Sequence, residues 1–427
     1  MLLDRRTFST LLAGAVAAPR VSFAQAAKEK SAFYSGVGPE LTHYEVDFDA
    51  ATLTRRGSVK IGGGIQYVWP HPSRRYLYVA SSSGGLGIAP VPGFAPDQHL
   101  LTTFGVAPSG ELSRLGEPLK LRQRPVHMSV DNAGEHALVA YNFPSALSVH
   151  KIKSDGSIGE EVKQPDNLDM GIYFHQVRAS PSGKTIVVVA RGNNPEGGKP
   201  EDPGSLHVYG FKDGRLSNMS KVAPNGGYGY GPRHLDIHPS KPWVYLSVER
   251  QNKLIVYKLK DDGDLAPEPL FTRETLADPA HRFPVQGAGP IHVAPAGGFV
   301  YLGNRSGVAA KAAPGVEDVD GQKVFSGGES NIAVFAINQT TGEPSTIQHA
   351  DIRAAHPRTF SLDPTGRMLV AASLAPTAVR RDGKVVTIPA GMTVFKVGSD
   401  GKLDFARKYD LDVGKLTQWW SGMIPLA

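Results

Sequence analysis

The chain repeats one pattern of hydrophobic and polar positions seven times between Thr42 and Arg407. Each copy is a short run in which apolar and polar residues alternate, followed by a turn rich in Asp, Ser or Gly. The copies read THYEVDFDAATL, TTFGVAPSGEL, LSVHKIKSDGSI, LHVYGFKDGRL, LIVYKLKDDGDL, IAVFAINQTTGE and MTVFKVGSDGKL. Alternation is typical of a half-buried β-strand, and strands that recur with turns between them indicate a radial β-architecture. The seven copies predict an all-β fold, a seven-bladed β-propeller.

A second pattern precedes six of these copies: a turn containing Pro or Asn and then a strongly apolar run, as in HPSRRYLYVASS and DPTGRMLVAAS. The turn residues are Pro72, Asn132, Pro181, Pro239, Pro295 and Pro364, which lie 49 to 69 residues apart. Insertions in loops between a constant set of strands explain this variation. We interpret residues 308–328 as one such insertion, a loop on the rim.

The two ends of the chain lack complete repeats. Residues 32–37 read AFYSGV, a strand without its preceding turn strand, and residues 418–424 read QWWSGMI, a spare strand. Pairing the two segments in one blade would hide sheet edges and close the ring. We therefore predict that N- and C-terminal strands share a blade, and that Trp419 and Trp420 pack there rather than form a ligand platform.

Polar residues recur at the ends of the predicted hairpins. The position six residues before each turn and the position ten residues after it should lie at the same end of an antiparallel pair, at one mouth of the central tunnel. The first position holds Gln66, Val126, His175, Arg233, Gly289 and Arg358, and the second holds Ser82, Asn142, Arg191, Glu249, Arg305 and Leu374.

Such a ring of polar groups predicts a functional site, because charged groups at an inner mouth must be paired or hydrated. Arginines outnumber the single carboxylate of Glu249, and guanidinium groups bind carboxylates in a bidentate manner. An anionic or carbonyl-bearing ligand is therefore expected. The alternative is a solvated ring of ion pairs that only closes the propeller.

Composition narrows the functions further. Hydrophobic residues make up 41% of the chain and charged residues 20%, which is ordinary for a well-packed protein. The net charge of +6 comes without a basic run interleaved with aromatic residues, so nucleic acid is not an expected partner. The chain has no cysteine, which excludes disulfides, thiolate metal sites and cysteine nucleophiles. We expect neither a metal nor a cofactor.

The first 26 residues, MLLDRRTFSTLLAGAVAAPRVSFAQA, have the order of a secretory leader. Arg5 and Arg6 are followed by Phe8, as in the twin-arginine export class, and Ala24 and Ala26 form a small-residue cleavage signal. The apolar run between them is far shorter than the ~20 residues that span a bilayer. We predict export by the twin-arginine machinery and a periplasmic or secreted domain over residues 27–427, with no membrane span.

Several longer motifs carry a family resemblance. GPRHLDIHP from Gly231, SVERQNKLIVYKL from Ser247, GNRSG from Gly303 and HPRTFSLDPTGRMLVAAS from His356 together resemble the β-propeller lactonase family. That family includes bacterial 6-phosphogluconolactonases and the fungal 3-carboxy-cis,cis-muconate cyclase. The resemblance implies a catalytic cleft lined by residues that the blade alignment also selects, namely His175, Arg233, Glu249 and Arg305.

The favoured function is therefore hydrolysis of a small lactone, a sugar lactone above all, at the channel mouth. Glu249 or His175 would activate water, Arg233 and Arg305 would hold the substrate carboxylate or the oxyanion, and Arg358, Arg191 and Asn142 would bind substrate. Two alternatives stay open: a lactonising cyclase of the carboxymuconate type and a non-catalytic periplasmic propeller that binds anions.

Overall fold

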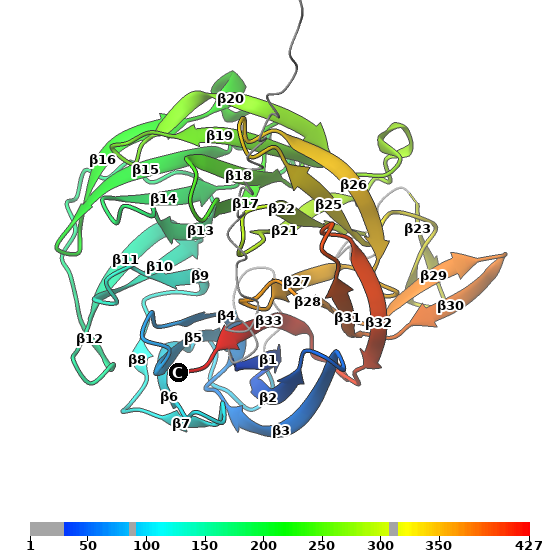
Figure 1. The fold of residues 1–427 in the computed structure, drawn as a ribbon, viewed down its shortest axis with the longest axis horizontal. Coiled ribbons are helices and arrows are strands. Elements are labelled where there is room, and N and C mark those ends of the chain that lie inside the picture. Colours follow the sequence, from blue (N-terminus) through cyan, green and yellow to red (C-terminus); the bar gives the residue numbers. More distant parts are fainter. Residues whose placement is uncertain (1–29, 85–90, 307–314) are drawn as a thin grey trace, which may run out of the picture.

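A computed structural model describes residues 30–84, 91–306 and 315–427. Seven antiparallel sheets, six with four strands and one with five, surround a central axis, as Figure 1 shows. The predicted all-β, seven-bladed propeller is confirmed. Blade 1 contains the N-terminal strands, and blades 2 to 7 are numbered in the order in which they follow it along the chain.

Apart from the C-terminal strand β33, which is red, the strands of the first four blades are blue to green in Figure 1. Blade 1 contains β1 (Ser31–Val37), β2 (Glu40–Asp47), β3 (Thr52–Lys60) and β33 (Gln418–Pro425). Blade 2 contains β4 (Gly64–Pro70), β5 (Tyr76–Ser82), β6 (His99–Val106), β7 (Leu112–Arg114) and β8 (Leu119–Lys120). Blade 3 contains β9 (Pro125–Val130), β10 (His136–Asn142), β11 (Ser145–Ile152) and β12 (Ile158–Glu161). Blade 4 contains β13 (Phe174–Ala179), β14 (Thr185–Ala190), β15 (Ser205–Lys212) and β16 (Arg215–Val222).

The remaining three blades complete the ring. Blade 5 contains β17 (Pro232–Ile237), β18 (Trp243–Val248), β19 (Lys253–Leu259) and β20 (Leu265–Glu274). Blade 6 contains β21 (Gly287–Val293), β22 (Phe299–Arg305), β25 (Asn331–Ile337) and β26 (Pro344–Asp351). Blade 7 contains β27 (Pro357–Leu362), β28 (Met368–Ser373), β31 (Gly391–Val397) and β32 (Leu403–Asp410). Among the described residues, two short 3-10 helices, η2 (Pro224–Gly227) and η3 (Pro279–His281), lie in the connections between blades.

The core lies between neighbouring blades. The second strand of a blade is covered on both faces, and β14 accordingly reads TIVVVA with all six residues buried. Outer strands such as β3 have one wet face and alternate between covered and exposed side chains. One apolar cluster joins Val187 of blade 4 to Val244 and Leu246 of blade 5. Apolar packing between blades therefore holds the ring together.

Tyrosine hydroxyls add a polar link between blades at one end of the propeller. In each case a second-strand tyrosine donates a hydrogen bond to a glycine carbonyl in the outer turn of the next blade. The pairs are Tyr34 with Gly110, Tyr78 with Gly156, Tyr245 with Gly342 and Tyr301 with Gly401. Gly342 has φ 81° and a Cβ there would lie 2.5 Å from the Trp243 ring, so the turn requires glycine. We call these four pairs the tyrosine latches.

The ring closes as predicted. Strand β1 pairs antiparallel with β33 over Ser31–Pro425 to Val37–Gln418, so both chain ends contribute to blade 1. Trp420 is buried in the core of this blade, which confirms its predicted packing role. Trp419 instead lies under the guanidinium of Arg358, 4.2 Å from ring centroid to Cζ, and so belongs to the mouth.

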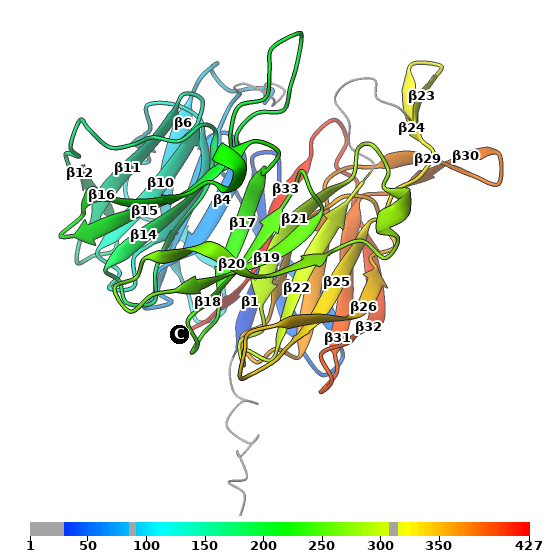
Figure 2. The same ribbon diagram turned by 90° about the horizontal axis from the view of Figure 1, so that it is seen from above.

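An eighth sheet extends the propeller on one side. It combines β23 (Val316–Val319) and β24 (Gln322–Phe325) from blade 6 with β29 (Thr377–Arg381) and β30 (Lys384–Ile388) from blade 7. Strand β24 pairs with β29 in parallel. Figure 2 shows this sheet protruding on the side away from the C-terminus. The part of 308–328 that the structure describes is thus a hairpin, which corrects the prediction of a plain loop.

The predicted leader, residues 1–26, lies outside the described residues. No helix among the described residues is long and apolar enough to cross a membrane.

Candidate active site

A repeated irregularity places the site residues. The innermost pair of strands shifts register near its start in blades 2 to 7, between Phe174 and Gln176 in blade 4 and between Pro232 and His234 in blade 5. His175 and Arg233 are the extra residues at these two bulges, and Arg358 occupies the same place in blade 7. Bulges change the direction of a side chain and occur next to active sites. The bulged residues therefore share one end of the tunnel.

Glu249 lies at the centre of the charged residues at this end. It follows β18, and its carboxylate meets guanidinium groups from three blades. Oε2 accepts from Nη1 of Arg191 at 3.2 Å, and Oε1 accepts from Nη1 of Arg233 at 3.3 Å and from Nη2 of Arg305. The Arg233 and Arg305 side chains are only 5% and 6% exposed, so these ion pairs are weakly screened. We call Glu249 and the three arginines the mouth cluster.

Electrostatics fix the charge of the mouth cluster. Burial alone would raise the pKa of Glu249, but Arg233, Arg305 and Arg191 together hold it well below its ordinary value. Glu249 is therefore an anion at neutral pH. Three cations surround one anion, which leaves the cluster with a net positive charge.

His175 and Arg358 lie beside the mouth cluster. The His175 ring packs edge to face on His234, with centroids 4.8 Å apart, and stacks on Tyr173 at 6.5 Å. Burial and then Arg233 hold the pKa of His175 well below its ordinary value, so its imidazole is neutral. Burial and the neighbouring Arg305 also lower the pKa of Arg358. Arg358 thus adds a further guanidinium group, from blade 7, to the positive charge at the mouth.

A cavity of about 320 Å³ opens onto the mouth cluster. It spans blades 4 to 7 and is lined by Arg191, Asn194, Gly231, Glu249, Arg250, Arg282, Pro284, Val285, Gln286, Gly287, Arg305 and His356. Arg233 and His175 do not line it. The volume is at the lower end of the range for small-molecule sites.

Several polar atoms at the mouth lack a hydrogen-bond partner among the described residues. They are Nε of Arg191, Arg233, Arg305 and Arg358 and Nδ1 of His175. Buried polar atoms are paired in most folded proteins, and exceptions need an explanation. At the mouth, the three arginines that share the single carboxylate of Glu249 outnumber the acceptors that it offers.

The site agrees with the sequence analysis in part. The structure brings together Arg191, Arg233, Glu249 and Arg305. Asn142 is buried at the end of β10 and, within the described residues, makes no hydrogen bond or ion pair to the mouth cluster. The register predicted the correct end of the tunnel for Asn142, but blade 3 lies outside the sector of the cavity.

Other residues at the mouth were not predicted. Arg250 pairs with Glu201, and Arg282 donates to the Arg250 carbonyl, so a second group of arginines lines the cavity. His356 contributes an imidazole. All three lie outside the two aligned positions of the repeat, although Arg250 directly follows Glu249 and His356 lies two residues before Arg358.

A deeper polar layer in the tunnel is self-compensated. Asp236 pairs with Arg178 at 3.2 Å and accepts from the Val293 amide at 2.9 Å. His292 lies 3.7 Å from the same carboxylate, and Arg178 rests on the Trp69 ring at 4.9 Å. One cation and one anion balance here, so this layer lacks the excess charge of the mouth.

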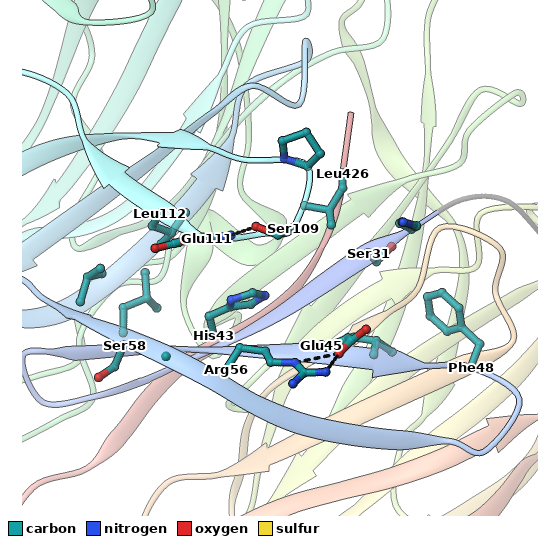
Figure 3. A pocket seen from close by; sticks show the side chains of 16 residues that line it. Ser31, His43, Glu45, Phe48, Arg56, Ser58, Ser109, Glu111, Leu112 and Leu426 are labelled. Carbon is teal, nitrogen blue, oxygen red and sulfur yellow. Dashed lines mark hydrogen bonds and ion pairs between the residues drawn. The ribbon is translucent and has the colours of Figure 1, made fainter.

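A larger cavity of about 880 Å³ lies elsewhere, between the outer parts of blades 1 and 2. Figure 3 shows His43 near its centre, with the ion pair of Glu45 and Arg56 on one side and Glu111 on the other. The Arg56 and Glu45 side chains are 56% and 57% exposed, and the two charges cancel. Size alone favours this cavity, but convergent buried charge favours the mouth, and we assign the candidate site there.

Among residues 30–84, 91–306 and 315–427, no group of three or more His, Asp or Glu side chains is placed to hold a metal ion.

Comparison with known proteins agrees with this fold. A family profile described as "Lactonase, 7-bladed beta-propeller" matches residues 31–383. The 6-phosphogluconolactonase of Bacillus subtilis (strain 168) is 26% identical over 339 residues, covering 77% of this chain and 83% of that protein. The 6-phosphogluconolactonase of Pectobacterium atrosepticum is 27% identical over 321 residues, covering 75% and 80%.

Two solved structures share the architecture. A putative 6-phosphogluconolactonase from Bacteroides uniformis superposes with a TM-score of 0.66 at 19% identity, covering 92% of this chain and 99% of that one. The periplasmic gluconolactonase of Pseudomonas aeruginosa gives a TM-score of 0.63 at 18% identity, covering 93% and 98%. At these identities the likeness establishes the fold.

Proposed function

The chain belongs to the lactonase family of seven-bladed β-propellers and is a lactonase-type enzyme, and from this premise we propose that it hydrolyses a small sugar lactone at the mouth cluster. The observation that carries the proposal is the excess of guanidinium groups around Glu249, two of which, on Arg191 and Arg305, line the cavity. A lactone carbonyl gains negative charge when water adds to it. Donors fixed at that oxygen stabilise the transition state more than the ground state.

Arg305 is our candidate for the oxyanion donor. Its Nη2 is already held by Glu249 and by the Ala288 carbonyl, so the guanidinium is fixed before substrate binds. Its side chain also lines the cavity. A fixed donor avoids the reorganisation that water would need at the same oxygen. Arg191, at the other side of Glu249, would hold substrate oxygens.

Glu249 acts in this proposal by holding the guanidinium groups. Both of its oxygens accept from arginines, and those charges hold its pKa well below the ordinary value, so it stays an anion whose lone pairs are bound to guanidinium groups. Without it, three like charges would repel one another. The carboxylate therefore keeps the arginines close enough to act together.

The names of the relatives support a sugar lactone as substrate. The proteins from Bacillus subtilis and Pectobacterium atrosepticum are named 6-phosphogluconolactonases, and a neighbour from Pseudomonas aeruginosa is named a periplasmic gluconolactonase. Arg250 and Arg282 at the cavity wall would favour a substrate with an additional anionic or oxygen-rich group.

Proton release in a pH-stat tests the function. The mature protein is given gluconolactone, its 6-phosphate and a muconolactone, with Arg305→Met and Arg56→Met as matched variants. We expect turnover of one sugar lactone, a loss of about 10²–10³ in kcat/KM for Arg305→Met, and an unchanged rate for Arg56→Met, whose exposed ion pair lies at the other cavity. Rates equal to spontaneous hydrolysis with saturable lactone binding would instead identify a binding propeller.

We also propose that the leader directs the folded propeller to the periplasm, because Arg5 and Arg6 begin an export signal. Replacing both by Lys should leave the precursor in the cytoplasm, whereas the native leader should yield the shorter mature chain in the periplasmic fraction. Equal amounts of mature chain in the periplasm from both versions would contradict the twin-arginine route.

A further inference from the structure

His356 is an imidazole in the cavity wall that the repeat pattern does not select. It directly precedes β27, the inner strand of blade 7, and lines the cavity with Glu249 and Arg305. The residue is half-buried and contributes to the wall of the space that a substrate would fill. Of the described residues that line this cavity, it is the one histidine.

The surroundings of His356 differ from those of the other two histidines that precede proline. His71 and His238 lie in turns at the opposite end, where Nε2 of each donates to the carbonyl of Gly134 and Gly297, both at 2.9 Å. Within the described residues, only the backbone of His356 is hydrogen-bonded and its ring is not. Two of these histidines hold turns, and the third leaves its ring nitrogens for another partner.

The backbone of His356 is held in an unusual conformation. Its φ is 55°, in the left-handed region that side chains with a Cβ rarely adopt. Its amide donates to Oγ of Ser330 at 3.1 Å, and its carbonyl accepts from the amide of Leu374 at 3.2 Å. Both backbone groups are therefore used to fix this conformation. Residues held in such regions cluster at active sites.

The charges around His356 keep its imidazole neutral. Burial and the guanidinium groups of Arg305, Arg358 and Arg233 hold its pKa well below the ordinary value, and Glu249 acts in the opposite direction. These groups come from blades 5, 6 and 7. A neutral imidazole has a free lone pair at neutral pH, which a base requires.

The two other candidates for a base are less well placed. Glu249 uses both carboxylate oxygens to bind arginines. His175 is 5% exposed and does not line the cavity. Of these three groups, only the ring of His356 combines a free lone pair with access to water in the cavity.

We propose, on the premise that this protein hydrolyses a lactone, that His356 is its general base. A ring nitrogen takes a proton from water while the water oxygen bonds to the lactone carbonyl carbon, and the carbonyl electron pair moves to its oxygen beside Arg305. The electron pair returns, the ring C–O bond breaks, and the imidazolium gives its proton to the departing oxygen. One water is added and the product is the open hydroxy acid.

The variant His356→Asn tests this role, because Asn tolerates a positive φ better than other side chains and does not titrate. We expect kcat to fall about 10²–10⁴-fold with KM and the thermal unfolding midpoint nearly unchanged. In the wild type, kcat/KM should fall as the pH decreases through the pKa of His356, and the variant should lose this acid limb. The matched control is His43→Asn, which removes an imidazole from the other cavity and should keep both rate and limb.

A second variant, His356→Gly, allows chemical rescue, since glycine accepts the same φ. Added imidazole should restore part of its turnover and should not affect His43→Asn. Full activity of His356→Asn with its acid limb intact, beside an active wild type, would overturn the role of His356 alone. A wild type that turns over no lactone of the panel would overturn the proposed function and this role together.

Discussion

The two ends of the propeller both bury polar side chains, but they pair them differently. At the end opposite the mouth, the tyrosine latches and the rings of His71 and His238 donate to backbone carbonyls of the next blade. At the mouth, charged side chains mainly bind one another around Glu249. A latch is complete once the chain has folded, because donor and acceptor both belong to the protein.

At the mouth, by contrast, folding alone does not give every buried donor an acceptor. Its arginines keep an unpaired Nε at four positions, and three cations of the cluster share one carboxylate. Such an arrangement costs stability, because buried donors and charges are left without full compensation. Buried polar groups that bind backbone carbonyls therefore indicate how the ring is held together. Buried charges that are only partly paired indicate a functional site.

The substitution Glu249→Gln disrupts the mouth cluster, and we expect it to have the largest effect on stability. Removing one partner of a buried ion pair leaves the other charge uncompensated, and three arginines depend on this carboxylate. We expect the free energy of unfolding to fall by about 3–5 kcal/mol, together with loss of turnover. Chemical denaturation at pH 7 measures the free energy of unfolding, and the pH-stat measures turnover. Citrate or another small polyanion should recover part of the lost stability.

The same substitution has a pH signature. The pKa of Glu249 in the folded protein is held well below its value of 4.5 in the unfolded chain. Its contribution to stability is therefore complete above about pH 4.5 and is lost as the pH falls through the folded pKa. The difference between wild type and Glu249→Gln should shrink in that window. Glu45→Gln, which breaks an exposed pair with Arg56, is the control and should change stability by less than about 1 kcal/mol. An equal effect of the two substitutions would contradict the comparison.

The sequence pattern indicated which residues gather at the mouth, but it did not indicate the tyrosine latches, and the difference has a physical reason. Arg233, Glu249 and Arg305 occupy fixed distances from a turn, and turn, strand and bulge recur with the blade. A latch joins residues far apart, such as Tyr245 and Gly342, which are 97 positions apart. No local pattern indicates that the two meet, because their contact depends on how neighbouring blades pack.

Three further differences between the sequence analysis and the structure have related causes. Asn142 has the predicted register, but register specifies the end of the tunnel and not the sector, and the cavity spans blades 4 to 7. His356 lies two residues before the aligned position, where its left-handed backbone rather than strand periodicity places it. The eighth sheet was not predicted because β24 and β29 come from insertions in different blades, and their pairing depends on blades 6 and 7 being neighbours.

The substitution Tyr245→Phe tests the other end of the propeller, and we expect it to have a smaller effect on stability. The Tyr245 hydroxyl is buried and donates to the Gly342 carbonyl at 2.9 Å, so its loss leaves that carbonyl without this partner. We expect the free energy of unfolding to fall by about 1–3 kcal/mol, measured by chemical denaturation, with kcat and KM unchanged because Tyr245 belongs to a latch and not to the mouth. Tyr228→Phe removes a hydroxyl from a side chain that is 54% exposed and should change neither quantity. If Tyr245→Phe instead lowered kcat at full stability, the latches would take part in catalysis and the two ends of the propeller would not be independent.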